Sequence, residues 1–213
     1  MTATYVVFEG IDGSGKTSTA AALGEVLTRV FYTPIHLAEP SHSRFGVEAR
    51  ELMVSDRQRD IAREHSLFTA DRVEHVTQKI APLLDFVKRV DSFLVIQDRY
   101  YLSAPVYQAE TRDQMRALLH EQQRLAPRPD RVFLLDVDAA VAAARIEARG
   151  GERCDDVGLL SERRERYREL AATSGEPVTI VDASKPLEVV VQSVWEQLRL
   201  PRLNLAPEER VRE

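Results

Sequence analysis

Short apolar runs alternate along the chain with longer segments in which apolar residues recur at helical spacing. Three of these runs, at residues 4–9, 93–97 and 132–137, are rich in β-branched, aromatic and other apolar side chains. Runs of this kind are typical of parallel strands that are covered on both faces. Shorter runs at 35–39 and 179–181 indicate two more strands, so the pattern predicts about five.

Helical patterns fill the intervals between the expected strands. In the last of them, Leu187, Val191 and Val194 share one face, which should pack against the sheet. Helices are expected from about residue 15 onward, and over 46–90, 101–126, 138–150, 159–174 and 186–199.

The alternation of strands and helices predicts a doubly wound parallel sheet, that is, a three-layer α/β fold with ligands beyond the carboxyl ends of the strands. A chain of 213 residues fits one such domain, which we expect to span residues 1–200. Residues 201–213 are polar and punctuated by proline, so a flexible tail is expected there.

One segment matches the phosphate-binding pattern G-x4-G-K-[ST] and lies between a predicted strand and a predicted helix. Glycines let the backbone fold closely around a phosphate, and the N–H groups of the loop and of the helix N-terminus create a positive concavity. Lys16 should reach the β and γ phosphates of ATP, and the Thr17 hydroxyl should bind Mg²⁺. The alternative is a glycine turn that only caps a helix, and it requires four fixed positions to coincide by chance. The expected phosphate-binding residues are Gly10, Ile11, Asp12, Gly13, Ser14, Gly15, Lys16, Thr17 and Ser18.

An acid and an arginine follow the predicted strand 93–97 directly. Asp98 and Arg99 should therefore lie at the carboxyl edge of the sheet, beside the phosphate loop. An acid in that place can hold Mg²⁺, directly or through water, and an arginine can pair with the oxygens of a transferring phosphate. The alternative interpretation is an ordinary ion pair at a strand end.

Composition narrows the choice of function. Lys and Arg number 29 and Asp and Glu 34, a net charge of -5 that disfavours a general nucleic-acid or anionic-membrane surface. Cys154 is the only cysteine, so no intrachain disulfide can form, and a cytoplasmic location is expected. Asn204 is the only asparagine, which excludes the N-K-x-D element of a switch GTPase. Neither H-E-x-x-H nor a pair of C-x-x-C motifs occurs, so a dedicated zinc site is not expected.

Three blocks, FEGIDGSGKTS, LFTADRVEH and DRYYLSAPVYQ, resemble the thymidylate kinase family in their residues, order and spacing. The resemblance extends from about Tyr5 to Asp182. It implies a P-loop kinase fold with a short arginine-containing lid, a homodimer, and transfer of the γ-phosphoryl group of MgATP to dTMP, which yields dTDP and ADP. Mg²⁺ and ATP are the expected cofactor and phosphoryl donor.

The resemblance also implies roles for residues around the acceptor. Asp12 looks like the acid that lies near the 3'-hydroxyl of the sugar, and Tyr107 like the tyrosine that packs against the deoxyribose. Phe68 and Arg72 lie four residues apart in a predicted helix and so share a face. By resemblance Phe68 stacks on thymine and Arg72 donates to its 4-carbonyl. The pattern alone is more typical of a core phenylalanine and a solvent-facing arginine, and the family resemblance reverses that preference. Further acceptor positions implied by the family are Arg99, Ser103 and Gln108.

A lid is expected at about residues 146–158, where ARGGERCDD resembles the segment that covers the ATP phosphates in the family. Gly13 agrees with this, because the family places a cationic arginine either in the phosphate loop or in the lid. Arg145 is as compatible with an exposed helical charge stripe as with a role in the lid. The expected catalytic residues are Lys16, Asp98, Arg99, Arg149 and Arg153, with Thr17 and Asp98 holding Mg²⁺.

The chain departs from the family at the acceptor side. Ala38 stands before Glu39 and Pro40, where many relatives carry an arginine that contacts the acceptor phosphate, so that contact is lost or is made by another group such as Arg44. Polar side chains near the base are replaced by Ala104 and Pro105. These departures leave open a related kinase for dUMP or a modified deoxypyrimidine monophosphate. A P-loop module that binds nucleotide without turnover is the alternative from another class.

Overall fold

The computed structural model describes residues 4–54, 60–90, 92–150, 156–198 and 200. Five parallel strands form one sheet in the order β2-β3-β1-β4-β5. This confirms the predicted parallel α/β fold, with helices on both faces of the sheet. The strands are β1 (Tyr5–Glu9), β2 (Thr33–Ala38), β3 (Phe93–Asp98), β4 (Arg131–Asp136) and β5 (Val178–Asp182).

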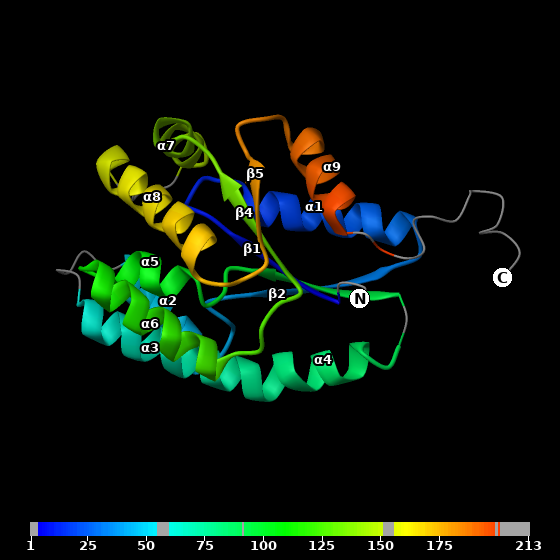
Figure 1. Cartoon of the computed structure of the whole chain (residues 1–213), viewed down its shortest axis with the longest axis horizontal. Helices are drawn as coiled ribbons and strands as arrows, with labels where there is room; N and C mark the ends of the chain where they lie inside the picture. The colour runs from blue at the N-terminus through cyan, green and yellow to red at the C-terminus, as the bar shows by residue number, and fades with distance from the viewer. Residues whose placement is uncertain (1–3, 55–59, 91, 151–155, 199, 201–213) are drawn as a thin grey trace, which may run out of the picture.

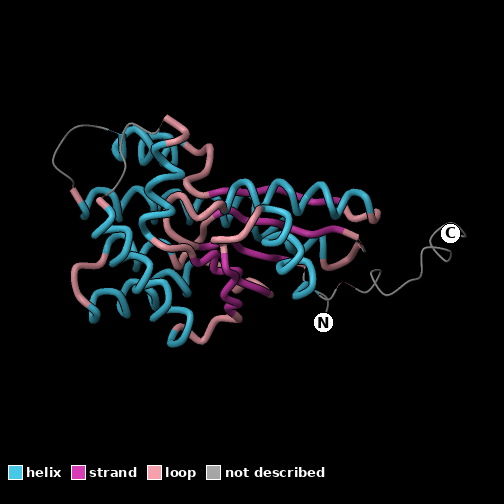
Figure 2. The backbone as a smooth tube through the Cα atoms, turned by 90° about the horizontal axis from the view of Figure 1, so that it is seen from above, coloured by secondary structure: helices cyan, strands magenta, loops and turns pink. Residues whose placement is uncertain are grey.

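Helices cover the sheet from both sides. Figure 1 shows α1 and α9 together on one side and the rod that contains α3 and α4 on the other. In Figure 2 the strands lie side by side between the helices. Within the described residues, no helix is long and apolar enough to cross a bilayer. The helices are α1 (Lys16–Arg29), α2 (Arg44–Val54), α3 (Ile61–His75), η1 (Val76–Ile80), α4 (Ala81–Val87), α5 (Ser103–Gln108), α6 (Arg112–Leu125), α7 (Ala139–Glu147), α8 (Val157–Thr173) and α9 (Leu187–Leu198).

The apolar runs form the core, as their pattern predicts. Every residue of β1 is buried, and so are the four central residues of β3 and of β4. Phe8 and Phe133 are fully buried and stack with ring centroids 5.6 Å apart, which ties β1 to β4. β2 begins at Thr33, two residues earlier than expected, and includes Pro34. Because β2 is an edge strand, the missing N–H of a proline costs the sheet little there.

Two expected helices are divided. The stretch 46–90 contains a new helix start at Asp60, whose side chain accepts a hydrogen bond from the Arg63 N–H. The stretch 101–126 breaks at Ala109, which takes an extended backbone, and Thr111 then opens α6 with a capping box. The long rod below the sheet passes from α3 to α4 through the π-helical turn η1, which ends two residues before Pro82. A proline inside a helix has no N–H to donate, which accounts for the altered pairing at this point.

Truncation of Phe133 to alanine should lower the free energy of unfolding by about 3–5 kcal/mol, because it removes a ring from the centre of the packed sheet. Urea denaturation measures the loss. Val141→Ala serves as the matched control, since Val141 lies in α7 with 39% of its surface exposed and should cost no more than about 0.5 kcal/mol. Equal losses in the two variants would contradict this assignment of the core.

Candidate functional site

The phosphate loop connects β1 to α1 at the carboxyl edge of the sheet. Gly13 and Gly15 both have positive φ, at 78° and 93°, values that side chains rarely adopt. A Cβ at Gly13 would collide with the carbonyl oxygen of Ala142 in α7, whereas one at Gly15 would meet open space. The loop therefore packs directly beneath α7, and no side chain fits at position 13 in this arrangement.

Lys16 begins α1 and is almost completely buried. Its Nζ donates hydrogen bonds to the carbonyl oxygens of Gly10 (2.9 Å) and Ile11 (2.8 Å), so the ammonium group lies inside the loop. Burial, together with repulsion from Arg99, lowers the pKa of Lys16 to about 8. An anion in the loop would favour the charged form of this lysine.

Thr17, in the first turn of α1, contacts Asp98 at the end of β3. The Thr17 hydroxyl donates to Oδ2 of Asp98 at 2.5 Å, while Oδ1 of Asp98 is buried and has no hydrogen-bond partner among the described residues. A hydroxyl and a carboxylate oxygen beside a phosphate loop suit Mg²⁺, which usually binds few protein oxygens and completes its shell with water and phosphate. The described residues contain no cluster of three or more His, Cys, Asp or Glu side chains that could hold a metal by themselves.

Arg99 turns the chain sharply after β3. Its φ is 63°, in the left-handed region, and its carbonyl oxygen accepts a hydrogen bond from Nε2 of Gln97 at 2.8 Å. The guanidinium donates to Asp12 and lies 3.3 Å from the Tyr107 hydroxyl, which itself donates to Asp12 at 3.0 Å. Burial alone would raise the pKa of Asp12, but Arg99 and Lys16 outweigh it and hold this pKa well below its usual range.

These groups line one cavity of about 180 Å³. The structure thus brings together the expected catalytic residues Lys16, Asp98, Arg99 and Arg149, although α7 ends before Arg149. Arg153 lies outside the described residues, as does Cys154. Arg145 is half-buried in the last turn of α7. The lining residues are Asp12, Gly13, Gly15, Lys16, Thr17, Ala38, Glu39, Asp98, Arg99 and Arg149.

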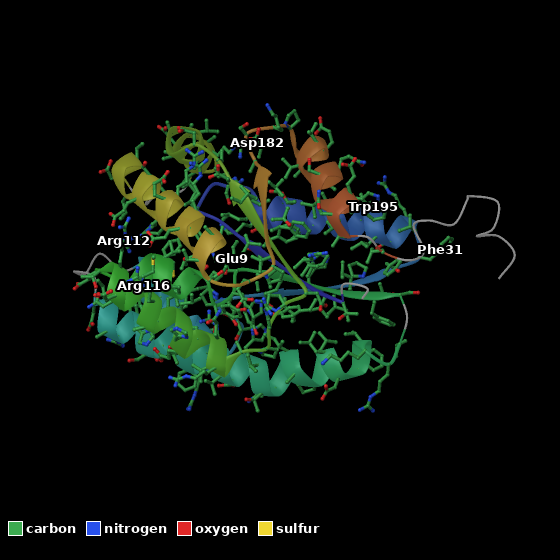
Figure 3. The ribbon with its side chains drawn as sticks, viewed as in Figure 1. Glu9, Phe31, Arg112, Arg116, Asp182 and Trp195 are labelled. Atoms are coloured by element: carbon green, nitrogen blue, oxygen red, sulfur yellow. The ribbon has the colours of Figure 1, made fainter. Side chains whose placement is uncertain are left out.

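Glu9 organises this region but was not among the expected site residues. It is 0% exposed and lies in the interior of the molecule, whereas Arg112 and Arg116 lie on an outer helix (Figure 3). Its carboxylate accepts hydrogen bonds from the Tyr100 N–H (3.0 Å), the Ser103 hydroxyl (2.7 Å) and the Tyr167 hydroxyl (3.0 Å). Burial raises the pKa of Glu9, and the hydrogen bonds only partly oppose this. In the sequence, the position of Glu9 at the end of a continuous apolar run indicates a buried acid.

Arg72 is buried, so the sequence-based alternative of a solvent-facing residue is wrong. Its side chain is 2% exposed, and it donates to Oε2 of Glu39 from Nε (2.8 Å) and Nη2 (2.5 Å). Nη1 donates to the side chain of Gln122. His75 lies 3.4 Å from the second oxygen of Glu39. The guanidinium is therefore held by protein partners, and neither Glu39 nor Gln122 carried a sequence signal for this role.

The other expected acceptor residues lie on α3 and α5. Phe68 is half-buried, one helical turn before Arg72. Ser103 is engaged by Glu9, and the side chain of Gln108 lies 3.0 Å from Nδ1 of His65. Ala104 and Pro105 are buried in α5.

Two further arginines near the site were not among the residues predicted from the sequence. The guanidinium of Arg163 in α8 lies 4.3 Å from the centre of the Tyr107 ring, over its face. Arg164, the next residue, pairs with Asp136 at the end of β4, where Nε and Oδ1 are 2.7 Å apart. The first contact joins α8 to α5, and the second joins α8 to the end of β4.

Comparison with known proteins gives consistent matches. The family model described as thymidylate kinase matches residues 8–194. A probable thymidylate kinase of Pyrobaculum aerophilum is 35% identical over 196 residues, which cover 92% of this chain and 96% of the relative. The probable thymidylate kinase of Archaeoglobus fulgidus is 33% identical, with 89% and 91% covered. The thymidylate kinase of Thermomicrobium roseum is 34% identical, with 90% and 92% covered.

Replacement of Arg72 by alanine should destabilise the fold by about 3–5 kcal/mol, because it leaves the Glu39 carboxylate buried without its partner. Urea denaturation again gives the measurement. Arg116→Ala, which breaks an exposed pair with Asp113, should cost no more than about 1 kcal/mol. Addition of Glu39→Gln to Arg72→Ala should recover part of the loss, since an amide is less costly to bury than a carboxylate. A fully stable single variant would contradict the buried ion pair.

Proposed function

The chain belongs to the thymidylate kinase family, and from this premise we propose that it transfers the γ-phosphoryl group of MgATP to dTMP, giving dTDP and ADP. The observation that carries the proposal is that Lys16, Arg99 and Arg149 line the same cavity as the hydrogen-bonded pair Thr17 and Asp98. Phosphoryl transfer requires mainly alignment and stabilisation of charge on the transferring group. A cavity lined by cationic side chains and by glycines of the phosphate loop meets these requirements.

Each residue has a physical role in this reaction. Lys16 and Arg99 would neutralise the oxygens of the transferring group, and Arg149 would add charge from the end of α7, with Arg153 in the proposed lid at 146–158. Thr17 and Asp98 would hold Mg²⁺, which when bound supplies charge neutralisation on the phosphates. Oδ1 of Asp98, which is buried and has no hydrogen-bond partner in the described part of the chain, supports this assignment. Direct transfer needs no covalent enzyme intermediate.

The acceptor would lie on the side of the cavity that faces α3 and α5. Asp12 is held ionised by Arg99 and oriented by Tyr107, so it presents a fixed acceptor for the hydrogen bond of a sugar hydroxyl. Phe68 and Arg72 would contact the base, with Arg72 exchanging a protein partner for the base carbonyl. The names of the relatives support dTMP over other pyrimidine monophosphates. An assay of ADP release with dTMP, dUMP, dCMP and UMP as acceptors tests this choice.

The oligomeric state, the location and the partners of the enzyme are part of the same proposal. A homodimer is expected from the family, and sedimentation measures it. A cytoplasmic location agrees with nucleotide substrates and with a single cysteine. The partners are then ATP and the acceptor, with no nucleic acid and no membrane.

Replacement of Lys16 by alanine should lower kcat about 100-fold or more, because it removes a preorganised cation from the transferring phosphate. The ADP-release assay with dTMP measures this. Lys88→Ala is the matched control, since Lys88 is exposed at the end of α4 and should keep full activity. The fold of both variants should stay intact by circular dichroism. Wild-type turnover in Lys16→Ala would refute the role of this lysine.

Binding of MgATP should weaken as the pH rises above about 8. Lys16 loses its proton near that pH in the free protein, whereas bound phosphates favour the charged form, so the complex holds more protons than the free protein. Calorimetry at pH 8.5 in two buffers of different ionisation enthalpy should detect proton uptake on binding. Lys16→Arg should abolish the uptake, because a guanidinium stays protonated throughout. Equal uptake in wild type and Lys16→Arg would assign the proton to another group.

A further inference from the structure

Tyr107 of α5 joins the phosphate cavity to the helix α8. On the cavity side, its hydroxyl donates to Oδ2 of Asp12 at 3.0 Å, and the guanidinium of Arg99 lies 5.1 Å from the centre of its ring. Asp12 and Arg99 both line the phosphate cavity. Tyr107 is therefore adjacent to the cavity wall, and its position affects the two polar groups that the proposed acceptor would meet there.

The helix α8 contacts the same ring from another direction. Arg163 and Tyr167 lie four residues apart in α8 and so share one face, and α8 packs against α5 (Figure 1). The guanidinium of Arg163 lies 4.3 Å from the centre of the Tyr107 ring. The ring of Tyr167 meets that of Tyr107 edge to face, with centroids 6.4 Å apart. Two side chains of α8 thus hold the Tyr107 ring.

Arg163 is a costly residue to bury at this place. Its side chain is 5% exposed, and a second guanidinium, that of Arg99, contacts the same ring. An apolar side chain of similar volume is usually no more costly to bury than an arginine. An aromatic face attracts a cation most strongly when both are removed from water. The buried charge is therefore better explained by an effect on Tyr107 and the site than by the stability of the fold.

The charge of Arg163 also acts on Asp12. Burial raises the pKa of Asp12, whereas Arg99, Lys16, the Tyr107 hydroxyl and Arg163 together lower it. Arg163 thus supports the ionised form of the carboxylate that Tyr107 orients. The same arginine affects both groups that surround the proposed position of the acceptor sugar.

We propose that Arg163 is a positioning residue that sets the selection of the acceptor sugar. It holds the Tyr107 ring from α8, so that the ring and its hydroxyl, bound to Asp12, form a rigid wall beside the deoxyribose. A rigid ring excludes an added 2'-hydroxyl by steric conflict, whereas a ring that is free to move accommodates it. The inference rests on the proposed kinase function and deepens it at the sugar.

Kinetics with dTMP and with its ribonucleotide analogue, which differs only by a 2'-hydroxyl, test this role. Arg163→Met removes the cation but keeps a side chain of similar length. The ratio of kcat/KM for dTMP to kcat/KM for the ribonucleotide should fall about 5- to 10-fold, the effect of losing one desolvated cation–π contact. The KM for dTMP should rise by a similar factor and kcat should change much less, because Arg163 acts through Tyr107 and Asp12.

Arg168→Met is the matched control, because Arg168 lies on the same helix with 46% of its side chain exposed and pairs with Asp136. It should leave both the ratio and the KM unchanged. Arg163→Lys should retain part of the selection, since an ammonium group also binds an aromatic face. Arg163→Gln, which keeps polar donors in the buried site, takes the place of Arg163→Met if circular dichroism shows that the latter does not fold. A purely structural arginine would lower activity with both nucleotides equally.

A double-mutant cycle with Tyr107→Leu tests whether Arg163 acts through the ring. In that background Arg163→Met should have little further effect on the ratio, because the contact is already lost. The proposal is overturned if Arg163→Met keeps the wild-type ratio, if its full effect persists without Tyr107, or if the wild type does not discriminate between the two sugars. Equilibrium dialysis gives the same ratio from dissociation constants, without turnover. A wild type that selects dTMP in binding but phosphorylates neither nucleotide would count against the kinase function and not against the role of Arg163.

Discussion

The site depends on the buried carboxylate of Glu9. This residue ends β1, immediately before the phosphate loop, and its two oxygens accept hydrogen bonds from the turn after β3 and from α8. The contact with the Tyr100 N–H fixes the backbone next to Arg99, which adopts a left-handed conformation that a side chain rarely takes. One carboxylate thus sets the distance between the loop that holds phosphate and the arginine that faces it. A buried charge with no exposure is costly, and the three hydrogen-bond donors offset only part of that cost.

Much of the fold was predictable because it follows from local patterns. Continuous apolar runs identified β1, β3 and β4, and the glycines with Lys16 and Thr17 identified the loop without any knowledge of tertiary contacts. Asp98 and Arg99 could be placed beside that loop, because the carboxyl ends of parallel strands share one edge. The breaks within the long helical stretches were missed, since helical periodicity alone does not reveal an extended residue such as Ala109.

The environment of Arg72 could not be predicted in the same way. Its partners, Glu39 and Gln122, lie 33 and 50 residues away in the sequence, so the network exists only after β2, α3 and α6 have packed together. A charged residue in a helix is usually solvent-exposed, and only three-dimensional packing reverses that expectation here. The burial of Glu9, in contrast, was predictable from the sequence, because this acid stands at the end of an apolar strand.

Two successive residues of α3 hold the loop that follows β2. Arg72 holds Glu39 at the start of this loop, and Asp71 holds Ser41 and Ser43 two to four residues later. Adjacent residues on a helix point about 100° apart, so one helix can hold both ends of the loop at once. Because Glu39 lines the phosphate cavity, this support from α3 fixes one part of the cavity wall.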